Sequence, residues 1–249
     1  MGQGKRLIIA FHGFGNDASL FLPIAEKLCN EYTLVSVDIP GHGGTKWLSP
    51  YFAKKDLMAV GQGIRNEFSV EKFSLLGYSL GARMALSIVE LQADWVDNLV
   101  LLAPDGLEKN FWHRMATGNP LGRQLFIDLM RNPKRYQTAL AYLRKYNLVD
   151  KTRYKFAMNY IENETERKRL MTVWPTTRKI APAIPIVKWH LEKQQVKTTV
   201  FMGKHDRIIP ANSGERFIKG LTQARLTVLD CGHAIINETN TPVIATAFE

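Results

Sequence analysis

The sequence predicts an α/β fold in which about six mostly parallel strands are flanked by helices, with a helical insertion. Three observations lead to this expectation. Short apolar runs recur along the chain, helical patterns separate them, and one long segment contains only helical patterns. The chain has 249 residues, of which 45% are hydrophobic and 22% charged, so it is long enough to bury a large core.

The apolar runs are nearly continuous in hydrophobicity rather than alternating. Strands that are buried on both faces, as in a parallel sheet, have this pattern. Helical patterns at 20–30, 52–67 and 80–91 separate the first runs, which indicates repeated strand–helix–strand units with right-handed crossovers. The predicted strands are 6–11, 32–38, 73–78, 96–104, 198–203 and 224–230.

The strand–helix alternation stops between residues 105 and 190, where one helical pattern follows another. Asn-Pro pairs at 119–120 and 132–133 predict turns within this segment, and Trp174-Pro175 predicts a further break. We therefore expect a core formed by residues 1–104 and 191–249, with residues 105–190 inserted as a separate helical unit.

The net positive charge of the chain comes entirely from this insertion. The formal net charge is +10, and the segment 105–190 holds 17 Lys and Arg against 7 Asp and Glu, whereas the remainder holds 16 of each. The surplus fits a solvated helical surface, or it steers an anionic substrate, an anionic membrane surface or an acidic partner. We expect no nucleic-acid partner, because no zinc-finger spacing or RNA-binding signature accompanies the charge.

Composition also bears on location. No apolar run approaches the roughly 20 residues of a membrane-spanning helix. The apolar run near the N-terminus has only five residues, which is too short for a signal peptide. Cys29 and Cys231 form neither a metal-binding nor a redox spacing. A cytoplasmic protein without a transmembrane segment is the simplest expectation, and the oligomeric state is left open.

The segment Gly77-Tyr78-Ser79-Leu80-Gly81 matches G-x-S-x-G at the point where a buried strand should meet a helix. A nucleophile elbow requires this context, because the tight turn leaves no room for side chains near it. Ser79 would then stand above the sheet at the N-terminus of a helix, and we predict that it is the nucleophile.

A serine nucleophile needs a base and an acid that orients the base. His233 follows the last predicted strand and Asp206 follows the preceding one, so the chain order Ser, Asp, His is the one that an elbow architecture uses. Asp105 is a competing acid, since it also follows a strand. His205 and His42 are weaker candidates for the base.

An acyl-transfer site also needs hydrogen-bond donors for the developing oxyanion. The backbone N–H of Leu80, directly after the serine, is one expected donor. The loop "FHGFGND" after the first strand should supply the second, and we assign it to the N–H of Phe14.

The motifs "FHGFG", "DIPGHGGT", "GYSLGAR", "GKHDRIIP" and "CGHA" resemble the successive motifs of the α/β-hydrolase superfamily. The resemblance implies an α/β-hydrolase fold in which the segment 105–190 is the cap, or lid. The superfamily usually has two strands before the "HG" strand, but here only six residues precede Leu7. The sheet should therefore be short. Nothing in these motifs calls for a metal or an organic cofactor.

Arg83 lies one helical turn after Ser79. The elbow "GYSLGAR" most resembles that of the menaquinone-pathway synthase that eliminates pyruvate, which implies that Arg83 binds a substrate carboxylate. A structural ion pair under the cap is the alternative role. Expected substrate-binding residues are Arg83, Tyr78, Trp112, Arg114 and Trp174, with Phe111 and Arg178 as further cap residues.

Together these features predict a cofactor-free serine hydrolase that acts on a carboxylic ester or thioester. Two alternatives stay open: the pyruvate-eliminating synthase, acting on a carboxylate-rich substrate, and a small-molecule-binding protein that keeps the fold. The synthase predicts pyruvate release that depends on Arg83. A binding protein predicts tight ligand binding with little turnover.

Overall fold

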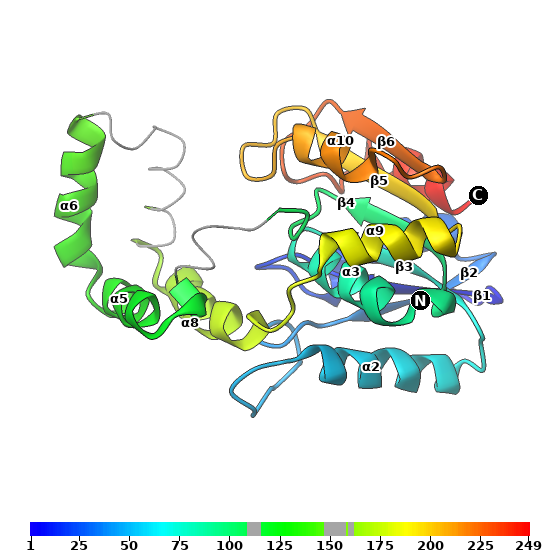
Figure 1. The fold of residues 1–249 in the computed structure, drawn as a ribbon, viewed down its shortest axis with the longest axis horizontal. Coiled ribbons are helices and arrows are strands. Elements are labelled where there is room, and N and C mark those ends of the chain that lie inside the picture. Colours follow the sequence, from blue (N-terminus) through cyan, green and yellow to red (C-terminus); the bar gives the residue numbers. More distant parts are fainter. Residues whose placement is uncertain (109–115, 147–157, 159–161) are drawn as a thin grey trace.

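The computed structural model describes residues 1–108, 116–146, 158 and 162–249 (Figure 1). Its six strands form one sheet in the order β2-β1-β3-β4-β5-β6, and every neighbouring pair is parallel. The strands are β1 (Arg6–Phe11), β2 (Tyr32–Val37), β3 (Phe73–Tyr78), β4 (Val96–Leu102), β5 (Lys197–Gly203) and β6 (Ala224–Leu229). Each predicted run coincides with one of these strands to within two residues at either end, so the predicted sheet is confirmed.

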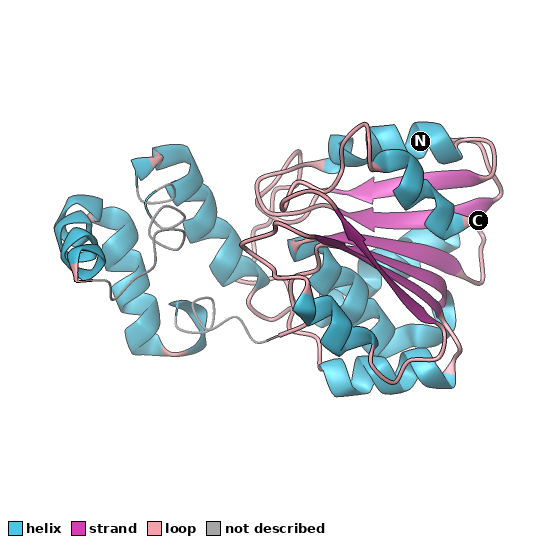
Figure 2. Cartoon of the chain, turned by 90° about the horizontal axis from the view of Figure 1, so that it is seen from above, coloured by secondary structure: helices cyan, strands magenta, loops and turns pink. Residues whose placement is uncertain are grey.

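Helices cover both faces of the sheet (Figure 2). They are α1 (Leu22–Leu28), α2 (Lys54–Glu67), α3 (Leu80–Gln92), α9 (Ile184–Lys193), α10 (Asn212–Ile218) and α11 (Thr241–Ala245), with short 3-10 helices η1 (Ala18–Phe21), η2 (Ala93–Trp95) and η3 (Thr246–Phe248). Leu7, Ile9 and Phe11 of β1 pack with α2, α3, α9 and α10, whereas Ile8 and Ala10 pack with α1 and α11. Because both faces are buried, alternate residues are equally apolar, which explains the continuous runs.

The insertion contributes α5 (Pro120–Arg131), α6 (Pro133–Lys145) and α8 (Glu164–Thr177) beyond the edge where the strands end (Figures 1 and 2). The two predicted Asn-Pro turns are confirmed as helix starts. The side chain of Asn119 accepts the N–H of Gly122 at 2.7 Å and caps α5. Pro120 and Pro133 are the first residues of their helices, where a missing N–H costs nothing.

The break predicted at Trp174-Pro175 is wrong, because α8 runs through Pro175 to Thr177. Pro175 stands in the last turn of the helix, so few backbone bonds depend on it. Tertiary packing outweighs the local preference: the Trp174 ring stacks on Phe126 at a centroid distance of 5.4 Å. The buried Thr177 hydroxyl donates to the carbonyl of Val173 at 2.7 Å, which holds the final turn closed.

Helix α9 begins inside the segment 105–190 but packs against α3 of the core. Its Val187 and Leu191 side chains are buried in the same cluster as α3. Directly before it, the N–H of Ala183 donates to Glu90 on α3 at 2.9 Å. This last helix of the predicted insertion is therefore packed as part of the core.

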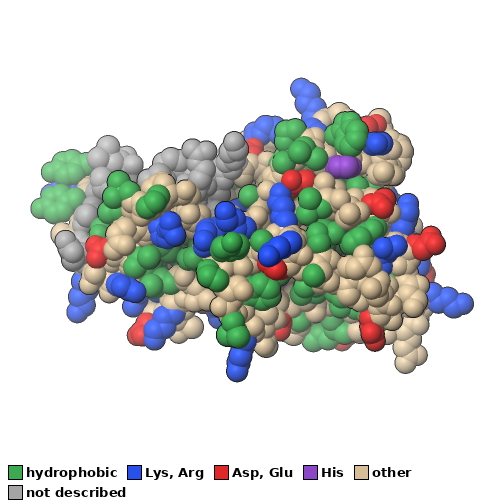
Figure 3. Space-filling model, turned by 60° about the horizontal axis from the view of Figure 1, so that its bottom comes forward, with side chains coloured by type: hydrophobic (Ala, Val, Ile, Leu, Met, Phe, Trp, Pro, Cys, Tyr) green, Lys and Arg blue, Asp and Glu red, His purple; other side chains and the backbone are tan. Residues whose placement is uncertain are grey.

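One face of the molecule is mixed in character. On the face seen in Figure 3, Lys and Arg side chains are scattered among hydrophobic ones. Within the described ranges, no helix combines the length and the apolar composition that crossing a bilayer requires.

Candidate active site

The turn from β3 into α3 holds Ser79 in a strained conformation. Its φ and ψ are 48° and −116°, outside the regions that ordinary residues favour. The turn depends on two close approaches. A Cβ on Gly81 would lie 1.9 Å from the carbonyl oxygen of Phe11, and one on Gly77 would lie 2.6 Å from the Cα of Ala82. Only glycine fits at both positions, which accounts for the G-x-S-x-G pattern.

Backbone hydrogen bonds align the ends of neighbouring strands around this turn. The N–H of Ser79 donates to the carbonyl of Leu102 at 2.9 Å, and the N–H of Ala103 donates to Phe201 at 2.8 Å. Further along the edge, the N–H of His205 donates to Cys231 at 2.9 Å. These bonds tie the loops after β3, β4, β5 and β6 together, so that Ser79 and the loops containing Asp206 and His233 meet at one edge.

The side chains of Ser79, His233 and Asp206 form one hydrogen-bonded chain. His233 Nε2 lies 2.9 Å from Ser79 Oγ, and its Nδ1 lies 2.7 Å from Asp206 Oδ2. The carboxylate accepts only, so Nδ1 carries the proton and Nε2 is left to accept from the serine hydroxyl. The other carboxylate oxygen accepts the N–H groups of Ile208 and Ile209 at 2.8 and 3.0 Å, which fixes its orientation. The Asp206 side chain is fully buried, whereas that of His233 is 21% exposed.

Tyr78 contacts His233 through its hydroxyl and its ring. Its hydroxyl donates to the backbone carbonyl of His233 at 3.1 Å, and the two rings lie 5.5 Å apart. Burial raises the pKa of Tyr78 to about 12, which keeps the hydroxyl protonated as a donor. This contact packs Tyr78 against His233, and its predicted role in substrate binding stays a prediction.

The two predicted oxyanion donors come from two segments, the serine turn and the loop after β1. Leu80 is the first residue of α3, where backbone N–H groups have no acceptor within the helix. Phe14 lies in the loop after β1, and its ring packs edge-on against His42 at 5.7 Å. Phe14 also packs against both the core cluster and the small cluster of the cap.

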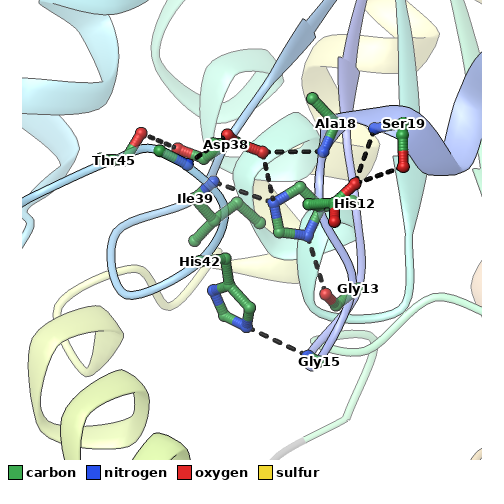
Figure 4. Close-up of polar contacts among 11 residues, drawn as sticks. His12, Gly13, Gly15, Ala18, Ser19, Asp38, Ile39, His42 and Thr45 are labelled. Carbon is green, nitrogen blue, oxygen red and sulfur yellow. Dashed lines mark hydrogen bonds and ion pairs between the residues drawn. The ribbon is translucent and has the colours of Figure 1, made fainter.

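A group of hydrogen-bonded polar residues beside the Phe14 loop was not predicted from the sequence (Figure 4). His12 Nδ1 donates to the carbonyl of Gly13 at 2.8 Å, and its Nε2 accepts the N–H of Ile39 at 3.0 Å. Asp38 accepts the N–H groups of Ala18 and Gly44 at 2.7 and 2.8 Å. The signal was present in "FHG" and "DIPGHG", where a histidine and an aspartate each end a strand.

The competing candidates for acid and base have other partners. Asp105 Oδ2 lies 3.6 Å from Arg83 Nε, while the imidazole of His233 is bonded to Asp206. His205 pairs with the exposed Asp230 at 2.9 Å, away from the serine. His42 is buried and accepts a backbone N–H rather than the hydroxyl of Ser79.

The remaining predicted binding residues lie in different surroundings. Arg83 is buried against Gly106 and its ion pair with Asp105 favours the structural role. Trp174 packs within the cap on Phe126. Arg178 lies over the ring of Tyr51 at 5.1 Å. Trp112 and Arg114, together with Phe111, lie outside the described residues.

Metal-binding chemistry has no counterpart in the described part of the chain. There, no group of three or more His, Cys, Asp and Glu side chains is arranged to hold a metal ion. The arrangement that is present, a serine hydroxyl bonded to an imidazole that is bonded to a buried carboxylate, is suited to nucleophilic acyl transfer.

Comparison with known proteins agrees with this architecture. The chain is 24% identical to monoacylglycerol lipase ABHD6 of Rattus norvegicus, over 94% of this chain and 72% of the relative. It is 25% identical to 2-hydroxy-6-oxononadienedioate/2-hydroxy-6-oxononatrienedioate hydrolase 1 of Pseudomonas putida, over 93% and 83%. Among solved structures, the α/β-hydrolase enzyme MGS-M2 from a Medee basin deep-sea metagenome library superimposes with a TM-score of 0.68. That superposition has 14% identity and covers 98% of this chain and 89% of the other. The family model described as alpha/beta hydrolase fold matches residues 6–238, and the chain therefore belongs to the α/β-hydrolase family.

Proposed function

We propose that the protein is a serine hydrolase that cleaves a carboxylic ester or thioester without a cofactor. The observation that carries the proposal is the hydrogen-bonded chain from Ser79 Oγ through His233 to Asp206, with distances of 2.9 and 2.7 Å. Both distances lie within the range in which a base activates a serine.

The mechanism follows from the roles that these atoms allow. Ser79 Oγ attacks the carbonyl carbon while its proton moves to His233 Nε2. The negative charge that develops on the carbonyl oxygen is stabilised by the N–H groups of Leu80 and Phe14. The Asp206 carboxylate holds the imidazole in place and stabilises its protonated form. His233 then gives the proton to the leaving alcohol or thiol, and water releases the acid in the reverse sequence.

The segment 105–190 is proposed to supply the cap over this site through its helices before α9, with an anionic substrate as the preferred class. Arg169 on α8 supports this preference. Its Nη1 lies 3.4 Å from the point that a Cβ on Gly15 would occupy, beside the loop that carries Phe14. Glu166 pairs with the same nitrogen at 2.6 Å, and the Arg169 side chain is still 30% exposed. A substrate carboxylate would therefore have access to a cation at the junction of cap and core.

The relatives support hydrolysis but differ in substrate. One is named a monoacylglycerol lipase and the other a hydrolase of a dienedioate or trienedioate, which are dicarboxylates. The second name agrees with an anionic substrate, and the first with an ester.

A fluorophosphonate probe tests the proposal, because it reacts covalently only with an activated serine. Intact mass should increase by one adduct in the wild type and stay unchanged in Ser79→Ala. An ester and thioester panel then identifies the acyl group. Absence of the adduct in a folded wild type, with pyruvate release or tight ligand binding instead, would replace the proposal with one of its alternatives.

A further inference from the structure

The loop Gly13–Gly15, which carries the Phe14 amide, is held by a histidine from a different part of the chain (Figure 4). We propose that His42 is a positioning residue for the oxyanion: by accepting the N–H of Gly15, it keeps the amide of Phe14 directed toward the site above Ser79. The inference rests on the proposed hydrolase function and adds a residue to it.

The contact joins two distant segments and is partly buried. The N–H of Gly15 donates to His42 Nε2 at 3.1 Å, across 27 residues of sequence. The His42 ring also packs edge-on against His12 at 5.0 Å and against Phe14 at 5.7 Å. His42 is 5% exposed, so its ring is shielded from competing water, while Gly15 itself lies at the surface.

The lone pair on Nε2 is available at neutral pH. Burial is the largest cause that lowers the pKa of His42 to about 4. The imidazole is therefore neutral, with its proton on Nδ1 and an acceptor at Nε2.

A second histidine fixes the other end of the loop. His12 donates to the carbonyl of Gly13 at 2.8 Å and accepts the N–H of Ile39, in the same turn that carries His42, at 3.0 Å. The loop is thus anchored on both sides of Phe14, by His12 at Gly13 and by His42 at Gly15.

The turn that carries His42 is itself pressed against the cap. Gly41 has a φ of +87°, and a Cβ on it would lie 3.1 Å from the side chain of Val173 on α8. His42 therefore stands between the cap helix and the Phe14 loop, and it acts on the reaction only through that loop.

A lost anchor should weaken binding of the transition state more than binding of the substrate. Removing an oxyanion donor outright costs about 100- to 1,000-fold in kcat. Loosening one end of its loop should cost less, about 10- to 100-fold in kcat, with little change in KM.

The experiment compares substitutions that differ in where they place an acceptor. His42→Phe keeps a ring without an acceptor, His42→Gln places an oxygen near the position of Nε2, and His42→Asn places one near Nδ1. Thr45→Val is the matched control, because it removes a hydrogen bond in the same turn, from Thr45 Oγ1 to the Asp38 carbonyl at 2.8 Å, and leaves the Gly15 contact intact.

The readouts are the rate constant of fluorophosphonate inactivation, kcat and KM for p-nitrophenyl butyrate, and amide hydrogen exchange at Gly15. His42→Phe and His42→Asn should lose about 10- to 100-fold in inactivation rate and kcat, with faster exchange at Gly15. His42→Gln should recover to within about fivefold of the wild type, because an acceptor is restored. Thr45→Val should retain the wild-type rate even where its melting temperature falls.

Two results would overturn the inference: His42→Asn reacting as fast as His42→Gln, or unchanged exchange at Gly15 in folded variants. If His42→Phe does not fold, the comparison of His42→Gln with His42→Asn still decides. A wild type that takes no label would defeat the proposed function instead, and the exchange at Gly15 would still test the His42 contact.

Discussion

Histidines stand at both sides of the edge where the strands end, and they differ in what their rings contact. Beside β5 and β6, His233 lies between two side chains, a serine hydroxyl and a carboxylate. Beside β1 and β2, His12 and His42 bond to backbone groups. A ring between side chains that exchange protons is placed for acid–base chemistry, whereas a ring bonded to backbone amides fixes a loop.

Burial accompanies this difference. The His233 side chain is partly exposed at the site, while His12 is fully buried and His42 nearly so. Burial is the largest cause that lowers the pKa of both His12 and His42. His12 and His42 therefore remain neutral at neutral pH, and His233 carries the proton transfer in the proposed mechanism.

The sharpest way to break the comparison is to remove the histidine that is assigned to acid–base chemistry. His233→Ala should slow fluorophosphonate labelling by about 100,000-fold, because the base is lost. His205→Ala is the control, since His205 pairs with Asp230 at the surface. It should label like the wild type. Comparable losses in both variants would remove His233 from its assigned role.

Substitution of the acid tests the choice between two strand-end aspartates. Asp206→Asn should lower kcat by about 10,000-fold, because the imidazole is no longer held in the required tautomer. Asp105→Asn, which removes the partner of Arg83, should stay within about threefold as long as the protein folds. Steady-state kinetics on one ester is sufficient, and the opposite order of effects would reassign the acid to Asp105.

The pH dependence of the free energy of unfolding tests whether the fold holds His42, on the β1–β2 side, in its neutral form. His42 has a pKa of about 4 in the folded chain and about 6.5 when unfolded. Between these values the unfolded state binds more protons, so the free energy of unfolding should rise with pH. His42 would contribute up to about 3 kcal/mol, which is complete above pH 6.5 and is lost toward pH 4.

Urea unfolding at a series of pH values measures this slope. His12 should add to it in the same direction, because its pKa is also lowered. In His42→Gln the slope between pH 4 and 6.5 should decrease, since glutamine does not titrate. An unchanged slope in that variant would show that His42 is not held neutral by the fold.

The smallest effect is expected at the junction with the cap. Arg169→Gln should reduce the preference for mono-p-nitrophenyl succinate over p-nitrophenyl butyrate by about 3- to 10-fold in kcat/KM, because one charge-assisted hydrogen bond is lost. Lys168→Gln is the matched control, because Lys168 is exposed and pairs with Glu164. An unchanged preference in Arg169→Gln, or an equal loss in both variants, would contradict an anion-reading role for Arg169.

Local pattern was sufficient for the sheet and for the elbow. The strands carry continuous apolar runs because both faces are covered, and Gly77 and Gly81 are required by contacts within a few residues of Ser79 or with the neighbouring β1. Local pattern failed at Trp174-Pro175, because stacking of Trp174 on Phe126, a residue of another helix, keeps α8 intact.

By itself the sequence determined the order of strands and helices, the turn that presents Ser79, and the short set of histidines and aspartates from which a base and an acid could come. Only the tertiary structure decided among them. His233 lies 154 residues from Ser79 and 27 from Asp206, and Gly15 lies 27 residues from His42. Such partners are selected by the order and register of the strands in the sheet, because parallel pairing brings the ends of β1, β2, β3, β5 and β6 to one edge.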